Sequence, residues 1–230
     1  MIFAASILMF LSGPLAAQTV FVPPSAIHAA DMLPAAPKDG SAVQKADLAE
    51  LHRIQAHRTA AAVARAQADA ATRNVFLFAT IFGPRFNAKA LPLTAALSAD
   101  VEAAEKADIE PVKYVFVRLR PFQFDKTLHP VCPASKKPDS YPSGHAMSGY
   151  LEALTLASIL PEKKDAIFAR ADDYAQNRLV CGVHYPSDVA AARLLAYALF
   201  ALLADDPRFA AARFAAQSEL RNRLGRQAAQ

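Results

Sequence analysis

The sequence predicts an all-α fold, a single-domain helical bundle of about eight helices. Alanine is abundant, while the 230 residues include only 7 glycines and no tryptophan, a composition that favours helices over sheets. Apolar residues recur at intervals of three and four over long stretches, which is the period of an amphipathic helix. No alternating strand pattern and no Asn-Gly hairpin turn occurs, so no sheet is expected.

The helical pattern begins at residues 45–73, where leucines, an isoleucine and then alanines recur at helical spacing. Residues 75–82 form a short, very apolar segment that Gly83-Pro84 stops. Pro111 is expected to open a new segment at residues 112–120. The remaining helices are expected at residues 93–106, 144–160, 162–176, 186–204 and 207–223.

Residues 1–17 are apolar and end in Leu15-Ala16-Ala17, which predicts a secretory signal peptide cleaved near Ala17. No Lys or Arg precedes the apolar run, so a short membrane anchor or a misassigned start codon is the alternative. Residues 18–44 are rich in proline and have no helical period. We expect them to form an extended arm on the body or on a neighbouring subunit, followed by a helical domain over residues 45–230.

Charge and hydropathy restrict the partners of the chain. The formal net charge is +4 and the sequence pI is about 9.1, too small and dispersed an excess to indicate nucleic acid but suited to an anionic substrate. Residues 189–204 are the most apolar run after the N-terminus, but they contain Arg193 and are shorter than the roughly 20 residues of a membrane span. We therefore expect a buried core helix and a soluble mature chain without a membrane span.

The stretch Tyr141-Pro142-Ser143-Gly144-His145 precedes an apolar, helix-prone run. A helix starting here would leave the N–H groups of Ser143, Gly144 and His145 unpaired at the positive end of its dipole, which favours an anion. Gly144 would allow close approach, Ser143 adds a hydroxyl donor, and His145 can move a proton near neutral pH. Taken alone, a proline-serine helix start with an incidental histidine explains the stretch equally well.

Lys113 and Arg120 are seven residues apart, so on a helix both side chains would share one face. Pro121 disfavours helix at Arg120, which places this arginine at a helix end. Arginine offers a planar fork that matches phosphate oxygens, and lysine offers a compact charge. Two solvated charges on a polar face are the alternative.

His184 and Asp188 are four residues apart, and Pro186 is placed to start a helix with Asp188 in its first turn. The carboxylate could hold one ring nitrogen of His184 and leave the other nitrogen free to attack a reacting atom. Helix capping by Asp188 beside a neutral histidine is the alternative interpretation.

These groups follow one another in a three-part pattern along the chain: Lys113-x6-Arg120-Pro121, then Pro142-Ser143-Gly144-His145, then Arg178-x5-His184-x3-Asp188. Here the sequence resembles the superfamily of type 2 phosphatidic acid phosphatases, bacterial nonspecific acid phosphatases and vanadium haloperoxidases. The residues around the motifs and the proline-rich arm are most similar to the bacterial class A acid phosphatases. Many members have serine where Asn177 stands, from which we expect an altered contact and not a lost activity.

The resemblance implies a role for each motif residue. The phosphoryl oxygens would be bound by Lys113, Arg120, Ser143, the N–H of Gly144, and Arg178. His184 would attack phosphorus and form a phosphohistidine, Asp188 would orient it, and His145 would protonate the leaving alcohol and then activate water. No metal and no other cofactor is expected, because the cationic side chains neutralise the charge and no carboxylate cluster lies near the motifs.

The chain has two cysteines, Cys132 in the loop before the central motif and Cys181 inside the third motif. Both motifs would converge on one phosphate, so the two sulfurs are expected to be neighbours and, in an exported protein, to form a disulfide. Two reduced, buried thiols are the alternative.

The function expected from this resemblance is an exported acid phosphatase, periplasmic or secreted. It would hydrolyse phosphomonoesters of broad type (nucleotides, sugar phosphates and aryl phosphates) and be inhibited by phosphate or vanadate. A lipid or lipid-pyrophosphate phosphatase, a vanadate-dependent haloperoxidase and a noncatalytic phosphate-binding protein are the alternatives. The lack of further membrane spans argues against the lipid phosphatase, and the short chain argues against the haloperoxidase. The presence of both His145 and His184 argues against the binding protein, because binding alone needs neither. No nucleic-acid partner is expected, and a homo-oligomer is left open.

Overall fold

The structure is a computed structural model, and it describes residue 21 and residues 28–225. The expected signal peptide and part of the expected arm lie outside the described residues. The regular elements among the described residues are all helices, with no strand, which confirms the all-α fold class. The elements are α1 (Ala29–Met32), α2 (Ala42–His57), α3 (Ala60–Ala70), η1 (Val75–Phe78), α4 (Ala79–Phe82), α5 (Pro92–Phe116), α6 (Pro121–Phe124), α7 (Gly144–Ile159), η2 (Pro161–Lys163), α8 (Lys164–Val180), α9 (Pro186–Asp205) and α10 (Pro207–Gly225).

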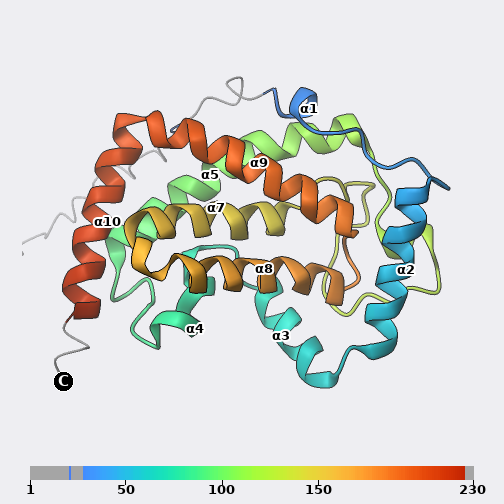
Figure 1. Cartoon of the computed structure of the whole chain (residues 1–230), viewed down its shortest axis with the longest axis horizontal. Coiled ribbons are helices and arrows are strands. Elements are labelled where there is room, and N and C mark those ends of the chain that lie inside the picture. Colours follow the sequence, from blue (N-terminus) through green and yellow to red (C-terminus); the bar gives the residue numbers. More distant parts are fainter. Residues whose placement is uncertain (1–20, 22–27, 226–230) are drawn as a thin grey trace, which may run out of the picture.

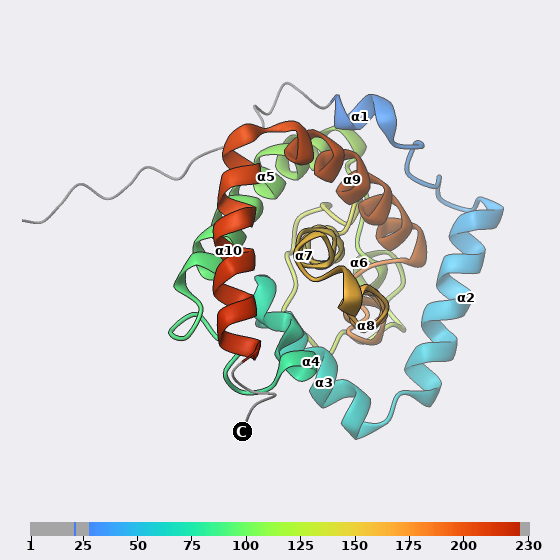
Figure 2. The ribbon, with the colours of Figure 1, turned by 60° about the vertical axis from the view of Figure 1, so that its left-hand side comes forward.

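Helix α7 forms the centre of the bundle. Seen nearly end-on in Figure 2, it is surrounded by α5, α8, α9 and α10, and it packs against all four. Its side chains are buried on every side, as expected of a helix that is apolar around its whole circumference. Met147, Leu151 and Leu156 are fully buried in the main core. The central motif therefore begins the most buried helix of the fold.

The ends of four helices meet at one end of the bundle. Helices α7 and α8 are antiparallel and are joined at the opposite end by η2, so the start of α7 lies beside the end of α8 (Figure 1). The start of α9 and the end of α5 lie at the same end, next to α2. This arrangement brings together three motifs that are far apart in the sequence.

Helix α5 is longer than the sequence predicts. It continues from Pro92 to Phe116 through Pro111, so the expected end of this helix at residue 106 is wrong. Ile109 and Val112, on either side of the proline, are buried, whereas Pro111 is exposed. Water can satisfy the carbonyl that the proline leaves without its N–H partner, and burial of the neighbours offsets a helix penalty of roughly 3 kcal/mol.

The chain leaves α5 before it reaches Arg120. Val117 has a left-handed conformation with φ of 40°, which ends the helix. Arg120 is instead the N-cap residue of α6, with an extended backbone. The prediction that Lys113 and Arg120 share a face of one helix is therefore wrong, although both side chains still reach the same loop residue, Asp139.

The single helical stretch expected at residues 45–73 is two helices, α2 and α3. Arg58 has an extended backbone that ends α2, and Thr59 caps α3 by accepting a hydrogen bond from the N–H of Ala62. The break between the two helices takes up only Arg58 and Thr59, and the helical spacing of apolar residues continues on both sides of it. The spacing alone therefore does not reveal the break.

The described part of the N-terminal arm packs on the body. Leu33 is buried in the main core, and the hydroxyl of Tyr141 donates to the Pro34 carbonyl at 2.8 Å. The ring of Phe21 lies edge-on to Phe209, with centroids 5.6 Å apart. The arm thus connects the central motif with α10.

Helix α9 is as long and as apolar as a membrane-spanning helix. Within the described residues it is the one helix long and apolar enough to cross a membrane by length and composition, with a mean hydropathy of 1.6. The core helix of a soluble protein passes the same test. Leu195, Leu199 and Leu203 of α9 are fully buried in the main core, whereas Leu194, Tyr197 and Leu202 are exposed. The expected buried core helix is therefore buried on one face only, and Arg193 pairs with Asp172 on its surface.

Candidate active site

Helix α7 begins at Gly144, as the sequence predicts, with Ser143 as its N-cap residue. The Ser143 hydroxyl oxygen accepts from the N–H of Ala146 at 3.4 Å, which leaves its hydrogen able to donate elsewhere. The N–H of Ser143 donates to the Asp188 carbonyl at 3.2 Å, so the expectation that it is unpaired is wrong. Among the described residues no acceptor bonds the N–H of Gly144 or His145, and these two groups are available to an anion.

The two ring nitrogens of His184 face different kinds of group. Nδ1 lies 2.8 Å from the Ser140 carbonyl and 3.3 Å from Asp188 Oδ2, both acceptors. Nε2 lies 3.2 Å from Arg120 Nη1, a donor. Because only a protonated Nδ1 satisfies two acceptors, the neutral ring carries its proton there and has a lone pair on Nε2. The expected holding of His184 by Asp188 therefore exists, with Ser140 as a second and closer partner.

Asp188 is fully buried in the first turn of α9. Its Oδ2 accepts from the Ser140 hydroxyl at 2.6 Å and from the N–H of Tyr185 at 2.9 Å, and Arg118 Nη1 donates to Oδ1 at 2.6 Å. Burial raises the pKa of Asp188, and the charge of Arg118 and these hydrogen bonds oppose that rise. The carboxylate is therefore held in one position beside the His184 ring.

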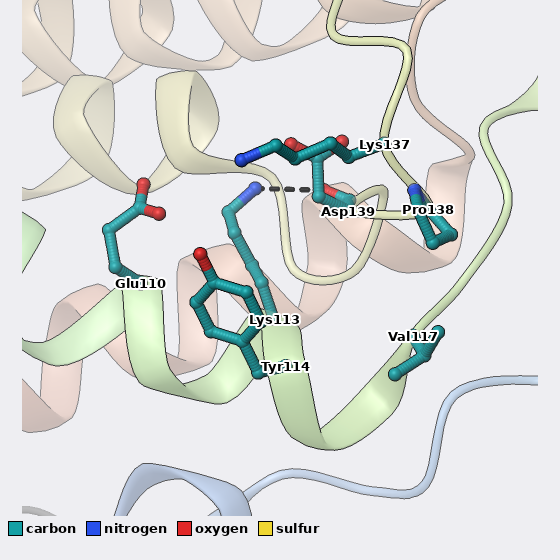
Figure 3. Close-up of a pocket in the computed structure, with 7 residues that line it drawn as sticks. All are labelled: Glu110, Lys113, Tyr114, Val117, Lys137, Pro138 and Asp139. Carbon is teal, nitrogen blue, oxygen red and sulfur yellow. Dashed lines mark hydrogen bonds between the residues drawn. The ribbon is translucent and has the colours of Figure 1, made fainter.

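Lys113 and Arg120 converge on one residue of the loop that precedes the central motif. Arg120 Nε pairs with Asp139 Oδ1 at 2.9 Å, and Lys113 Nζ donates to the Asp139 carbonyl at 2.8 Å. Burial lowers the pKa of Lys113, and the nearby charge of Arg120 adds to this effect. A cavity of about 160 Å³ opens beside Lys113 (Figure 3), which is the one site residue predicted from the sequence among those that line it: Glu110, Lys113, Tyr114, Val117, Lys137, Pro138 and Asp139.

Arg178 is a buried cation with an unused donor. It lies in α8 with 2% of its surface exposed, and among the described residues its buried Nε has no hydrogen-bond partner. Burial lowers the pKa of Arg178, while Tyr174 and Asp69 act against this shift. A buried unpaired donor is costly unless a ligand satisfies it, so this nitrogen indicates an anion site.

His145 lies in the first turn of α7 and is partly exposed. Its Nε2 is 3.3 Å from the Ala70 carbonyl, and its ring stacks near that of Tyr174 with centroids 6.5 Å apart. Burial lowers the pKa of His145 to about 2. Three nearby charged or titratable groups add to this effect, in the order Arg178, Arg73 and His184.

Burial also lowers the pKa of His184 well below its ordinary value. Three cations add to the effect, in the order Arg120, Lys113 and Arg178. A group of three cations around two neutral imidazoles and a helix N-terminus attracts a compact oxyanion. Within the described ranges, no group of three or more His, Cys, Asp or Glu side chains is arranged to hold a metal ion.

Comparison with known proteins identifies the family of the chain. The family model of the PAP2 superfamily matches residues 75–210, more than half of the chain, and includes all three motifs. The chain belongs to the PAP2 superfamily. This membership confirms the resemblance seen in the motifs.

Curated relatives of the chain include bacterial acid phosphatases. The chain is 33% identical over 193 residues to the non-specific acid phosphatase of Providencia stuartii, an alignment that covers 80% of this chain and 77% of that protein. It is 32% identical over 150 residues to the non-specific acid phosphatase of Salmonella typhimurium, where the alignment covers 62% of this chain and 59% of that protein. The similarity to the first of these extends over most of both chains.

A solved PAP2 structure shares the fold. The transmembrane PAP2 type phosphatidylglycerolphosphate phosphatase from Bacillus subtilis superposes with a TM-score of 0.50 at 22% identity, over 71% of this chain and 85% of that one. At this identity the match shows the helical architecture alone.

Arg118 contacts the candidate site and lies outside the three PAP2 motifs. Besides Asp188, its guanidinium pairs with Asp47 Oδ2 at 3.0 Å and lies 3.8 Å from the ring centre of Tyr185. In the extended segment after α5, Arg118 and Arg120 point inward while Val117 and Leu119 are exposed. The alternation of an extended chain could have revealed it, because side chains two residues apart share a side.

Arg73 is a second such residue, and it lies behind the start of α7. Its Nη2 donates to Glu105 at 2.8 Å and to the Ser148 hydroxyl at 3.0 Å. A Cβ at Gly144 would lie 3.4 Å from this nitrogen. A larger residue at Gly144 would therefore press on the Arg73–Glu105 pair as well as on an approaching anion.

The expected disulfide between Cys132 and Cys181 is present, with an S–S distance of 1.99 Å and a Cα–Cα distance of 5.2 Å. The alternative of two reduced thiols is thus wrong. The bond joins the loop before the central PAP2 motif to the turn that carries the third motif. Asn177, in the place of the usual serine, donates to Asp69 Oδ2 at 2.7 Å and so contacts α3 instead of the pocket.

Proposed function

We propose that this PAP2 protein is an acid phosphatase that hydrolyses phosphate monoesters of broad type through a phosphohistidine on His184. The observation that carries the proposal is the fixed tautomer of His184. Its Nδ1 faces two acceptors, Ser140 and Asp188, and its Nε2 faces the Arg120 guanidinium. An unprotonated nitrogen beside a cation is arranged to attack an electron-poor centre that carries negative oxygens.

In the proposed first step, the phosphoryl group binds at the start of α7. The oxygens are bound by Lys113, Arg120, Arg178, the Ser143 hydroxyl and the N–H of Gly144. His184 Nε2 attacks phosphorus, and the bond from phosphorus to the alcohol oxygen breaks. The positive charge that forms on the ring is stabilised by Asp188 through Nδ1–H.

In the proposed second step, water replaces His184. His145 protonates the leaving alcohol oxygen in the first step, and its neutral ring then takes a proton from the attacking water. The water oxygen bonds to phosphorus, the bond from phosphorus to Nε2 breaks, and inorganic phosphate leaves. The cations stay in place through both steps, so no metal ion is required for charge neutralisation.

The lowered pKa of His184 is consistent with nucleophilic attack at acidic pH. Because its pKa lies well below the ordinary value, Nε2 keeps its lone pair at pH values that protonate an ordinary histidine. His145 has a pKa of about 2 in the pocket without an anion, since burial and cations disfavour its charged form. A bound phosphoryl anion offsets those cations and raises the pKa of His145, which lets the ring carry the proton for the leaving group.

Export to the periplasm or to the exterior is part of the proposal. The apolar residues 1–17 support it, and so does the Cys132–Cys181 disulfide, since disulfides persist in oxidising compartments. Nucleotides, sugar phosphates and aryl phosphates would be substrates, and phosphate and vanadate would be competitive inhibitors.

Replacement of the two histidines tests the assignment. His184→Ala should form no covalent intermediate with any substrate. His145→Ala should lose alkyl phosphate hydrolysis most, because an alkoxide needs a proton to leave, while an aryl phosphate with an acidic phenol should still phosphorylate His184. His57→Ala, at an exposed position on α2, serves as the matched control.

The measurement is rapid-quench trapping with labelled substrate, followed by mapping of the modified residue, with and without a chelator. Labelled His184 that accumulates in His145→Ala supports the mechanism, and activity that survives the chelator supports metal independence. Label on His145 in His184→Ala, or an equal loss for alkyl and aryl substrates in His145→Ala, would contradict it. Bromide oxidation after vanadate loading would favour a haloperoxidase, and phosphate binding without turnover a binding protein.

A further inference from the structure

Asp139 places an anion of the protein itself against the two cations of the first motif. Its carboxylate accepts from Arg120 Nε at 2.9 Å, and its backbone carbonyl accepts from Lys113 Nζ at 2.8 Å (Figure 3). The side chain is 24% exposed and lies on the wall of the cavity beside Lys113. One loop residue therefore engages both groups that would otherwise face a phosphoryl oxygen.

The Arg120 guanidinium lies between Asp139 and His184. Its Nε contacts the carboxylate, and its Nη1 lies 3.2 Å from His184 Nε2 and donates to the Val183 carbonyl at 2.9 Å. A phosphoryl group placed for attack by His184 would use the same guanidinium. The Asp139 carboxylate and the bound phosphoryl group would then lie on opposite sides of one guanidinium.

Asp139 is charged under working conditions. Burial acts to raise its pKa, but the hydrogen bond from Arg120 and the charges of Arg120 and Lys113 outweigh burial and lower it. The hydroxyl of Ser135 also acts to lower the pKa of this carboxylate. The other charged or titratable groups on the cavity wall are Glu110, Tyr114 and Lys137.

We propose that Asp139 is an affinity-determining residue that competes with the phosphoryl group for Arg120 and Lys113. The proposal rests on the proposed function, because it takes the phosphoryl group to bind beside His184. In the free protein the carboxylate stabilises the two cations. In the complex it repels the bound anion, which weakens the hold on the phosphate product and speeds its release.

The competition makes anion binding depend on pH. A bound phosphate raises the pKa of Asp139, so binding becomes coupled to uptake of a proton and strengthens as the pH falls. Above the pKa of Asp139 in the complex, the repulsion is fully present. Phosphate itself also titrates, so the informative quantity is the ratio of affinities between wild type and a variant at each pH.

Asp139→Asn keeps the backbone carbonyl for Lys113 and removes the charge. Inorganic phosphate binding is measured by calorimetry, and inhibition by vanadate is measured during turnover, between pH 4 and pH 8. At pH 8 the variant should bind phosphate on the order of tenfold more tightly than wild type, since one like charge near the anion is gone. The ratio should stay near this value down to about pH 5 and become smaller below it, because a tenfold effect corresponds to a rise of about one unit from a pKa that starts below the ordinary value of an aspartate. Asp139→Ser is a second variant if the asparagine protein does not fold.

Asp206→Asn is the matched control. It removes the same charge from an aspartate that pairs with Arg208 at 2.6 Å, at the far end of the 20-residue helix α9, about 30 Å from the pocket. Its phosphate affinity should equal that of wild type at every pH.

Equal or weaker phosphate binding by the folded Asp139 variants would overturn the proposal and would show that the carboxylate serves to position Arg120. A tightening that Asp206→Asn reproduces would also overturn it. Because calorimetry measures phosphate binding without turnover, phosphate binding with no hydrolysis would contradict only the proposed function. Absence of phosphate binding by all variants would contradict both.

Discussion

Replacement of Arg118 by methionine tests how the buried cation supports the site. Arg118 is 6% exposed and pairs with two buried carboxylates, those of Asp188 and Asp47. Methionine fills a similar space but has no charge and no donor. Asp188 would keep its bonds from Ser140 and Tyr185 and lose its only cation at bonding distance in the described chain.

The loss of one partner from a buried ion pair costs about 3–5 kcal/mol, because the remaining charge is left buried. For a domain of this size each kcal/mol lowers Tm by about 2–4 °C, so Arg118→Met should lower Tm by about 6–20 °C. The charge of Arg118 holds down the pKa of Asp188, which burial raises. Without Arg118 the pKa of Asp188 rises further, and the acid side of the pH–activity profile should move to higher pH, since a protonated Asp188 cannot stabilise the charged His184 ring.

Stability is measured by thermal and by urea unfolding at fixed pH, and activity by kcat against pH with an aryl phosphate. Arg193→Met is the matched control, because Arg193 pairs with Asp172 on the surface, where both side chains are about half exposed. An exposed pair contributes about 0–1 kcal/mol, so the control should change little. If Arg118→Met unfolds at the same urea concentration as the control and its pH profile coincides with wild type, the reasoning about the buried cation is wrong.

Three further predictions concern stability. Cys132→Ala with Cys181→Ala should lower the free energy of unfolding by about 4 kcal/mol, given a loop of 49 residues, and the unreduced, denatured wild type should titrate no thiol. Burial raises the pKa of Glu152 to about 8. Wild type should therefore lose stability relative to Glu152→Gln as the pH rises from about 4.5 to about 8, by up to about 1.4 kcal/mol per pH unit. A constant difference in the free energy of unfolding, measured in urea across that range, would contradict this. Asn177→Ser should cost about 1 kcal/mol through the lost bond to Asp69 and leave kcat within about twofold, and a large loss of kcat would place Asn177 in the pocket.

Local signals in the sequence predicted the elements that begin with a cap. Pro142-Ser143 and Tyr185-Pro186 mark the starts of α7 and α9, because the capping bonds are made within a few residues. The length of α5 could not be predicted in this way. Whether a helix continues through Pro111 depends on the burial of its neighbours, and Ile109 is buried beside Gly144 at the start of α7, which comes later in the chain.

The sequence motifs predicted which residues meet, but not all of their partners. The spacing of His184 and Asp188 is local, and the structure places them as expected. Arg118 and Asp188 are 70 residues apart, and Asp139 reaches Arg120 only because the loop at residues 125–143 folds back across the helix ends. Such contacts depend on how loops pack, and no short pattern encodes them.

The position of the pocket at one end of the bundle leaves the opposite end open to protein engineering. The turn η2 joins α7 to α8, and Pro161, Glu162 and Lys163 are all exposed. Helix α7 has 16 residues, so this turn lies about 24 Å from Ser143. Exposed turns tolerate insertions and chemical attachment. A peptide tag inserted after Glu162, or a resin coupled through Lys163, should hold the protein with its pocket facing the solution and leave KM for small substrates unchanged.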